Sequence, residues 1–281
     1  METTSYRFRL GAFDCLAVAD GTHDYPLKSF FANTPLAQVE AALRERGQPV
    51  DYIRTPYTNL YVDTGAHRAL VDMGAGSLAP TTGQLAGNLR AAGVDPLEID
   101  AILITHAHPD HVGGTLDDDG NPIYPNAHYY IWQGEWDFWT SDVAFEKVPE
   151  MFVSVARTQL QPVLDQFVLV EREGEVLPGI SILSAPGHTP GHTVISFESG
   201  GKRLLYISDT VLHPLHLEHP DWTPIYDIYP DQAEASKRRI FDLAAAEGAL
   251  VLGQHFHPFP SIGRVSKVGA GWQWVPIEAA S

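Results

Sequence analysis

The chain has 281 residues, of which 18 are Lys or Arg and 35 are Asp or Glu, so its formal net charge at pH 7 is −17. Nucleic acids and anionic membranes attract basic surfaces, so we expect neither as a partner. Hydrophobic residues make up 44% of the chain, and no apolar run is long enough to span a membrane, which predicts a soluble, cytoplasmic protein. The single cysteine, Cys15, excludes an internal disulfide and a zinc ribbon, which leaves histidines and carboxylates as metal ligands.

The first half of the chain alternates short β-rich runs with turn residues. We expect strands over residues 6–13, 15–19, 58–63 and 69–72. Apolar residues at helical spacing predict a helix over 35–46, with Thr34 as its N-cap, and a second helix over 83–92. The apolar run at 102–104 ends abruptly in polar residues, which is typical of a buried strand that carries a site at its tip.

The second half begins with residues 132–164, which are rich in aromatic side chains and predicted to be helical. β-rich runs return at 180–183, 193–197 and 204–207, and the clearest helix of the sequence covers 232–246. A strand at 250–252 and a β-rich stretch over 265–275 follow. Strands in both halves, with helices after each set, predict two packed sheets with helices outside, in a single domain of residues 1–281.

Four potential metal ligands follow the 102–104 run within six residues: His106, His108, Asp110 and His111. Alternate residues of an extended chain point to the same side, so His106 and His108 can converge. Asp110 can cap a following helix while offering an oxygen, and imidazole with carboxylate suits Zn²⁺, Fe or Mn. A solvated polar loop is the alternative. Three further β-rich runs that end in His or Asp beside Gly, at 187–192, 208–209 and 253–258, argue against it.

With these motifs in this order, the chain resembles the metallo-β-lactamase superfamily. The His-x-His-x-Asp-His signature is present in full at 106–111, and the resemblance extends from about residue 59 to residue 263. It implies an α+β fold, a four-layer αβ/βα sandwich, with two divalent metal ions in a groove at the sheet edges. The implied metal ligands come from several strand ends and are His106, His108 and His192 for one ion, Asp110, His111 and His255 for the other, and Asp209 as the bridge.

Outer positions of the site are less sharply defined by the resemblance. His188 stands four residues before the implied ligand of the Thr-Pro-Gly-His element, so it is expected to support the site rather than bind metal. His255 aligns with a ligand and His257 with a proline of related chains. Asp72 resembles an aspartate that orients ligands, with turn formation as the alternative. His213 resembles a position of the lactonase-like and phosphotriesterase-like branches, with a polar loop as the alternative.

The resemblance implies a hydrolase in which a metal-bridging hydroxide opens a lactone or an ester, as in quorum-quenching lactonases. Zn²⁺ lowers the pKa of bound water toward about 7, and Asp110 and Asp209 would act at the reacting centre. The two metals are expected to be Zn²⁺, with Fe, Mn or Co as alternatives. A phosphotriesterase or aryl esterase of the same fold is one alternative function. A non-hydrolytic di-iron redox or metabolite-binding protein is an alternative of another class.

The expected substrate is a small, neutral and partly apolar molecule, which needs an apolar wall. Aromatic side chains are the candidates for this wall, each with a core position as its alternative: Phe30, Phe31, Trp132, Trp136, Phe138, Trp139 and Trp222. Leu212 stands three residues after Asp209, where some acyl-homoserine lactonases have tyrosine, which argues against a direct transfer of their substrate. Relatives often dimerise, and an exposed contact at Phe30 and Phe31 would serve a homodimer.

Overall fold

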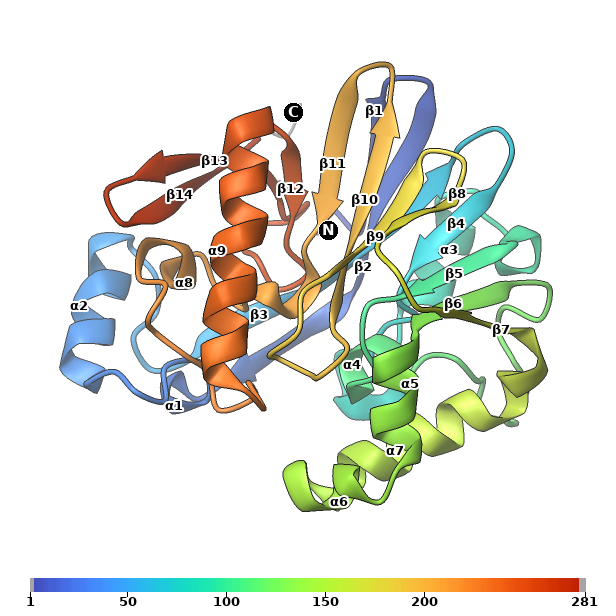
Figure 1. Ribbon diagram of the computed structural model, residues 1–281, viewed down its shortest axis with the longest axis horizontal. Coiled ribbons are helices and arrows are strands. Elements are labelled where there is room, and N and C mark those ends of the chain that lie inside the picture. The colour runs from blue at the N-terminus through green and yellow to red at the C-terminus, as the bar shows by residue number, and fades with distance from the viewer. Residues whose placement is uncertain (1–2, 278–281) are drawn as a thin grey trace.

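The computed structural model describes residues 3–277, in which two seven-stranded sheets face each other with helices on their outer sides (Figure 1). The first sheet is antiparallel from β1 to β4 and parallel from β4 to β7. Its strands, in spatial order, are β1 (Ser5–Leu10), β2 (Phe13–Tyr25), β3 (Ile53–Asp63), β4 (Arg68–Val71), β5 (Ala101–Ile104), β6 (His128–Trp132) and β7 (Phe167–Val170).

The second sheet is antiparallel except for the parallel pair of β11 and β12. Its strands, in spatial order, are β14 (Gly271–Pro276), β13 (Ile262–Val268), β12 (Leu250–Leu252), β11 (Lys202–Tyr206), β10 (Thr193–Ser199), β9 (Ile180–Ser184) and β8 (Gly174–Leu177).

Nine α-helices and four short 3₁₀ helices lie among residues 3–277. The α-helices are α1 (Leu27–Phe30), α2 (Leu36–Glu45), α3 (Leu85–Ala91), α4 (Pro109–Val112), α5 (Gln133–Thr140), α6 (Val143–Lys147), α7 (Glu150–Leu160), α8 (Leu215–Glu218) and α9 (Pro230–Glu247). The 3₁₀ helices are η1 (Gly76–Leu78), η2 (Pro96–Glu98), η3 (Gln161–Gln166) and η4 (Ser208–Thr210). In this described part of the chain, no helix has the length and apolar character needed to cross a bilayer.

Successive side chains of β5 point to opposite faces of the first sheet, and each face is covered by a separate hydrophobic core. Ala101 and Leu103 point into the core between the two sheets, whereas Ile102 and Ile104 point into the core beneath the helices that cover the first sheet. A third core lies between the second sheet and α9, where Phe241 is fully buried. These layers confirm the predicted α+β sandwich, and the helical prediction for 132–164 is confirmed by α5, α6 and α7.

Two predicted helix N-caps differ from the structure. Pro35, and not Thr34, occupies the N-cap position of α2, and no side chain caps that helix. Asp110 lies in the first turn of α4, where His108 holds the N-cap position. Pro109 explains this second difference, since a proline is preorganised for the first helical position and so starts the helix two residues earlier.

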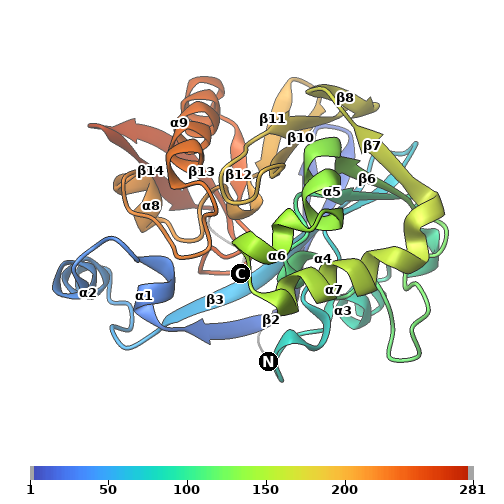
Figure 2. The ribbon, with the colours of Figure 1, turned by 60° about the horizontal axis from the view of Figure 1, so that its bottom comes forward.

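Strands β2 and β3 extend from the first sheet toward α1 and α2 (Figure 2). Their pairing changes register between Ala19 and Gly21, so that one residue of β2 is bulged. A one-residue shift moves odd-numbered side chains of β2 onto the face that even-numbered ones occupied before. His23 and Tyr25 therefore share a face with Tyr57 of β3.

Candidate metal centre

Two groups of metal-ligating side chains meet at one edge of the sandwich, and Asp209 belongs to both. Within each group, the ligand atoms lie within 4.8 Å of one another. The first group is His106, His108, His188 and Asp209, and the second is Asp110, His111, Asp209 and His255.

The ends of neighbouring strands deliver these side chains. His106 and His108 follow β5, and Asp110 and His111 lie in α4, which begins directly after them. The other ligand candidates come from the second half of the chain: His188 from the loop between β9 and β10, Asp209 from η4 after β11, and His255 from the segment after β12. Because parallel strands end at the same edge, residues that are far apart in sequence converge there.

Asp72 fixes the orientation of His111. Its Oδ2 atom lies 2.8 Å from His111 Nδ1, and its Oδ1 atom accepts the backbone N–H of Thr105 at 2.8 Å. Asp72 adopts a left-handed backbone conformation, with φ of 55°, that turns its buried carboxylate toward both residues. Since Nδ1 of His111 donates to this carboxylate, Nε2 carries the lone pair that faces the site.

His188 and His255 are oriented in the same way. His188 Nδ1 lies 2.9 Å from Asp227 Oδ1, and His255 Nδ1 lies 3.3 Å from the carbonyl oxygen of Pro56. Each ring therefore donates its Nδ1 hydrogen outward and directs its Nε2 lone pair inward. In the neutral imidazole the inward nitrogen is an acceptor, which is the form in which histidine binds metals. Against burial, neighbouring carboxylates raise the pKa values of His111 and His188, so a cation that binds here displaces protons from these nitrogens.

The inward lone pairs face carboxylate oxygens, which are acceptors too. Asp209 Oδ1 lies 3.1 Å from His255 Nε2 and 3.4 Å from His111 Nε2, and Asp209 Oδ2 lies 3.2 Å from His188 Nε2. Asp209 Oδ1 is buried and has no hydrogen-bond partner among residues 3–277. Acceptors that face acceptors in a buried site repel one another unless a proton or a metal cation lies between them. The donor set therefore fits two divalent cations that share Asp209.

Burial prepares two histidines of the first group for a metal. It lowers the pKa values of His106 and His108 well below the usual range, so both imidazoles are neutral at pH 7. Burial opposes ionisation of Asp209, but His255 and His111 hold the pKa of its carboxyl well below the usual range. Neutral imidazoles and an ionised carboxylate are the protonation states that metal binding requires.

Glu135 of α5 connects two of the ligand segments from behind. Its fully buried carboxylate accepts hydrogen bonds from the backbone N–H groups of Ala107 and Gly191, both at 3.0 Å. It also accepts from the hydroxyl of Thr189 and the indole N–H of Trp139, both at 2.6 Å. Burial raises the pKa of Glu135, and these four donors oppose that effect. The residue is thus a support for the site that the sequence analysis did not identify.

The arrangement of His188 and His192 differs from the expectation. His188 Nε2 lies 2.9 Å from His108 Nδ1 and joins the first group. His192 stands just before β10, where its Nε2 accepts the backbone N–H of Asp209 at 3.2 Å and its Nδ1 lies 3.2 Å from the carbonyl oxygen of Ala185. With both ring nitrogens engaged, His192 supports the bridge and His188 occupies the expected ligand position.

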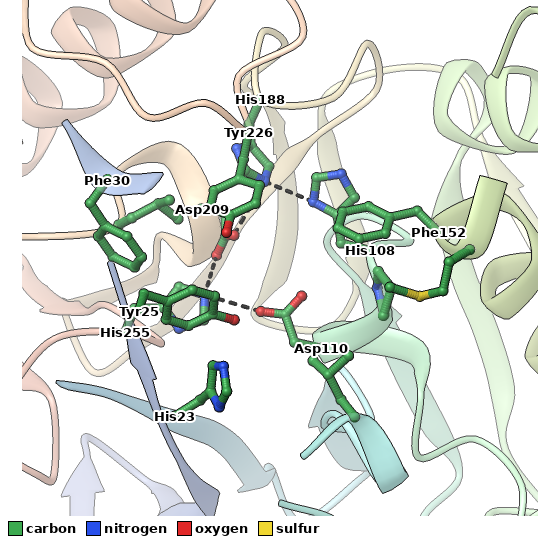
Figure 3. A pocket seen from close by; sticks show the side chains of 14 residues that line it. His23, Tyr25, Phe30, His108, Asp110, Phe152, His188, Asp209, Tyr226 and His255 are labelled. Carbon is green, nitrogen blue, oxygen red and sulfur yellow. Dashed lines mark hydrogen bonds and ion pairs between the residues drawn. The ribbon is translucent and has the colours of Figure 1, made fainter. Parts of the chain in front are cut away.

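A cavity of about 220 Å³ opens above the two groups (Figure 3). Of the expected aromatic wall, Phe30 lines it. Leu212, three residues after Asp209, also lines it. Its other walls come from residues that the sequence analysis did not select, since their segments are distant in sequence from the metal-ligand motifs: His23, Tyr25, Leu78, Met151, Phe152 and Tyr226.

Other aromatic candidates do not line this cavity. Phe31 is 1% exposed and packs against His213 and Trp222, so neither it nor Phe30, at 2% exposure, offers the expected dimer contact. Trp136 and Trp139 line a separate cavity of about 240 Å³ beneath α7. The indole of Trp139 nevertheless lies edge-on to the ring of His108, at a centroid distance of 5.5 Å, so it supports a proposed ligand from behind and does not line the substrate cavity.

His213 and His257 also lie outside the site. Both line another cavity, of about 250 Å³, beside Leu43 of α2. Nδ1 of His213 accepts the backbone N–H of Leu215, and His257 is exposed. The expected role of these two histidines near the substrate therefore does not fit the structure, whereas Asp72 lies where it was expected.

Comparisons with known proteins agree with this geometry. Residues 54–255 match the Metallo-beta-lactamase superfamily. N-acyl homoserine lactonase AiiA of Bacillus thuringiensis subsp. kurstaki is 25% identical over 169 residues, which are 59% of this chain and 60% of that protein. Hydroxyacylglutathione hydrolase GloC of Haemophilus influenzae is 29% identical over 126 residues, or 41% of this chain and 51% of that protein. The chain thus matches less than two thirds of the length of these curated relatives.

Two solved structures superpose over the whole chain. AidC, described as a dizinc quorum-quenching lactonase in complex with a product, has a TM-score of 0.93 and 27% sequence identity, and the match covers 100% of both chains. The hydrolase AbOPH, described as being in the beta lactamase superfamily, has a TM-score of 0.92 and 28% identity with the same coverage. Together with the match over residues 54–255, this similarity shows that the chain belongs to the metallo-β-lactamase superfamily.

Proposed function

We propose that the protein is a metal-dependent hydrolase that opens a lactone or a related ester. The observation that carries this proposal is the pair of ligand groups that share Asp209 at the floor of the cavity. The superposition with AidC, a dizinc lactonase, supports the same reaction class. The proposed ligands are His106, His108 and His188 for one ion, Asp110, His111 and His255 for the other, and Asp209 for both.

The lining of the cavity supports a neutral, partly apolar substrate. Phe30, Leu78 and Phe152 supply apolar walls, and no lysine or arginine is among the described residues that line the cavity. Away from the proposed metal ions, the lining therefore offers no guanidinium or ammonium group that would pair with an anionic part of the substrate. Apolar walls with a few convergent polar groups are typical of small-molecule sites.

The chain's own residues prepare this reaction. Two bound divalent metals would activate water at neutral pH and polarise the carbonyl of the substrate. Asp72, Asp227 and the carbonyl of Pro56 hold three imidazoles in the orientation for binding these ions. A thiol nucleophile is excluded, because burial raises the pKa of Cys15 to about 12 and β2 holds its side chain in the core between the sheets.

Proton release by the zinc-loaded protein tests the proposal. The substrates are a series of acyl homoserine lactones together with simple γ- and δ-lactones, and Asp209→Ala is the control. We expect turnover by the wild type, none by Asp209→Ala, and fewer than two zinc ions per chain in that variant. Full activity of Asp209→Ala would contradict the shared site.

The same assay separates the alternatives. No turnover of lactones, combined with turnover of aryl esters or phosphotriesters, would assign the protein to the esterase or phosphotriesterase alternative. Metal analysis after expression separates the redox alternative, since zinc leaves the protein colourless whereas a di-iron centre absorbs visible light.

A further inference from the structure

Two tyrosine hydroxyl groups meet at the wall of the cavity. The hydroxyl oxygens of Tyr25 and Tyr57 lie 2.5 Å apart. Tyr25 lines the cavity and directs its hydroxyl toward Asp110 (Figure 3). Tyr57 lies behind it and is fully buried, with its ring edge-on to that of His255 at a centroid distance of 5.3 Å. Of the two residues, Tyr25 alone presents its hydroxyl to a bound molecule.

Burial decides which of the two hydroxyls donates. A buried O–H group that finds no acceptor costs about 1–3 kcal/mol. Tyr25 is the hydrogen-bond partner of the Tyr57 hydroxyl, and no other is found within residues 3–277. Tyr57 therefore donates to Tyr25, which leaves the hydrogen of Tyr25 free to point into the cavity.

The ring of Tyr25 is held by three neighbouring rings. His23 contacts it edge-on at a centroid distance of 4.6 Å, Phe30 lies at 5.3 Å, and Tyr226 lies at 6.2 Å. These contacts fix the position of the hydroxyl before a substrate arrives. A donor that is fixed in advance stabilises a developing charge without paying for its own reorientation.

The other residues of the wall do not offer an equivalent hydroxyl. Leu212, three residues after Asp209, lines the cavity with an aliphatic side chain. Tyr226 also lines the cavity, but Ser29 is a partner that can accept the hydrogen of its hydroxyl, whereas Tyr57 donates to Tyr25 and leaves the hydrogen of Tyr25 free. Among the described residues of the wall, Tyr25 is thus the tyrosine whose hydrogen can point at a molecule bound beside the two ligand groups.

We propose that Tyr25 donates a hydrogen bond to the carbonyl oxygen of the substrate, and that Tyr57 is the positioning residue that directs this hydrogen. The inference rests on the proposed hydrolysis at the same site. The oxygen of water bonds to the carbonyl carbon, negative charge develops on the carbonyl oxygen, and the ring C–O bond then breaks. One proton of water ends on the leaving ring oxygen and the other is released from the new carboxylic acid. Tyr25 keeps its own proton throughout.

The experiment compares the zinc-loaded wild type with Tyr25→Phe, Tyr57→Phe and the double variant, on the best substrate of the lactone and ester series. Phenylalanine keeps each ring and removes only the hydroxyl. Tyr124→Phe is the matched control, because the Tyr124 hydroxyl is buried in another part of the chain and has no hydrogen-bond partner among residues 3–277. The measured quantities are kcat, KM and zinc content.

We expect Tyr25→Phe to lower kcat by about 100-fold, with a much smaller change in KM. This is the lower end of the loss in kcat that is typical when one hydrogen-bond donor to a developing oxyanion is removed. Tyr57→Phe alone should lower kcat by about 10-fold. The double variant should have the same kcat as Tyr25→Phe, because the Tyr57 hydroxyl acts through Tyr25. Tyr124→Phe should match the wild type. All four variants should keep wild-type zinc content.

The results that would contradict the role of Tyr25, the role of Tyr57 and the proposed function differ from one another. Wild-type kcat in Tyr25→Phe would overturn the role of Tyr25, and additive losses in the double variant would overturn that of Tyr57. A kcat loss in Tyr124→Phe equal to that in Tyr25→Phe would show a general effect of removing tyrosine hydroxyls. No hydrolysis of any lactone or ester by the zinc-loaded wild type would instead overturn the proposed function and this inference with it.

Discussion

The carboxylate of Glu135 accepts a hydrogen bond from the backbone N–H of Ala107 at 3.0 Å, and this contact attaches α5 to the peptide between His106 and His108. The other carboxylate oxygen accepts the backbone N–H of Gly191 at 3.0 Å. A Cβ atom at Gly191 would lie 2.2 Å from the backbone nitrogen of Glu135, so this close approach requires glycine. One side chain on a helix thus holds two segments that belong to different sheets.

Replacing Glu135 by glutamine tests this support. The amide presents N–H groups where the carboxylate accepts four hydrogen bonds, so at least one buried donor loses its acceptor. We expect the free energy of unfolding to fall by about 2 kcal/mol and zinc to be lost faster to a chelator. Denaturant unfolding and zinc release check this, with the exposed Glu146→Gln as the control. Equal zinc release in both variants would contradict the role of Glu135.

The two histidines of the loop between β9 and β10 can be separated by substitution. His188→Ala removes an imidazole that faces Asp209, whereas His192→Ala removes one whose nitrogens meet backbone groups. We expect His188→Ala to bind fewer than two zinc ions per chain and to lose turnover, and His192→Ala to retain more zinc. Zinc analysis after dialysis measures the difference. The reverse order would restore His192 as the ligand.

Lys237 of α9 predicts a pH dependence of stability. Burial lowers its pKa from 10.5 to about 8, and its ammonium donates to the carbonyl oxygen of Pro220 at 2.9 Å. Between these two pKa values the unfolded chain binds more protons at this site than the native chain, so stability rises with pH. Relative to Lys237→Met, the wild type should gain about 2 kcal/mol in free energy of unfolding from pH 7.5 to pH 9.5. A constant difference across this range, measured by denaturant unfolding, would rule out the shift.

Cys15 should be chemically inert in the folded protein. Burial raises the pKa of its thiol to about 12, and its side chain is 2% exposed, so almost no thiolate is available at pH 8. We expect iodoacetamide to modify the denatured chain but not the native one, and Cys15→Ala to keep its activity. Mass spectrometry detects the modification. Rapid labelling of the native chain would contradict the predicted burial.

Local spacing along the chain determined part of the site by itself. His106, His108, Asp110 and His111 stand within six residues after an apolar strand, and this proximity needs no tertiary contact. The fold class followed from β-rich runs and helical periods in each half. The sandwich is confirmed, because alternation along strands such as β5 already specifies which faces are buried.

Only the tertiary structure decided between neighbours of the same chemical type. His188 and His192 both follow glycine in one loop, and what separates them is that β10 begins at Thr193 and leaves His192 against backbone groups. Likewise, Tyr25 faces the cavity because a bulge between Ala19 and Gly21 reverses the alternation of β2. A bulge depends on the pairing of two strands, so a local sequence pattern does not reveal it. The local pattern determined the types of metal ligand, whereas the packing of distant segments determined which residues reach the site.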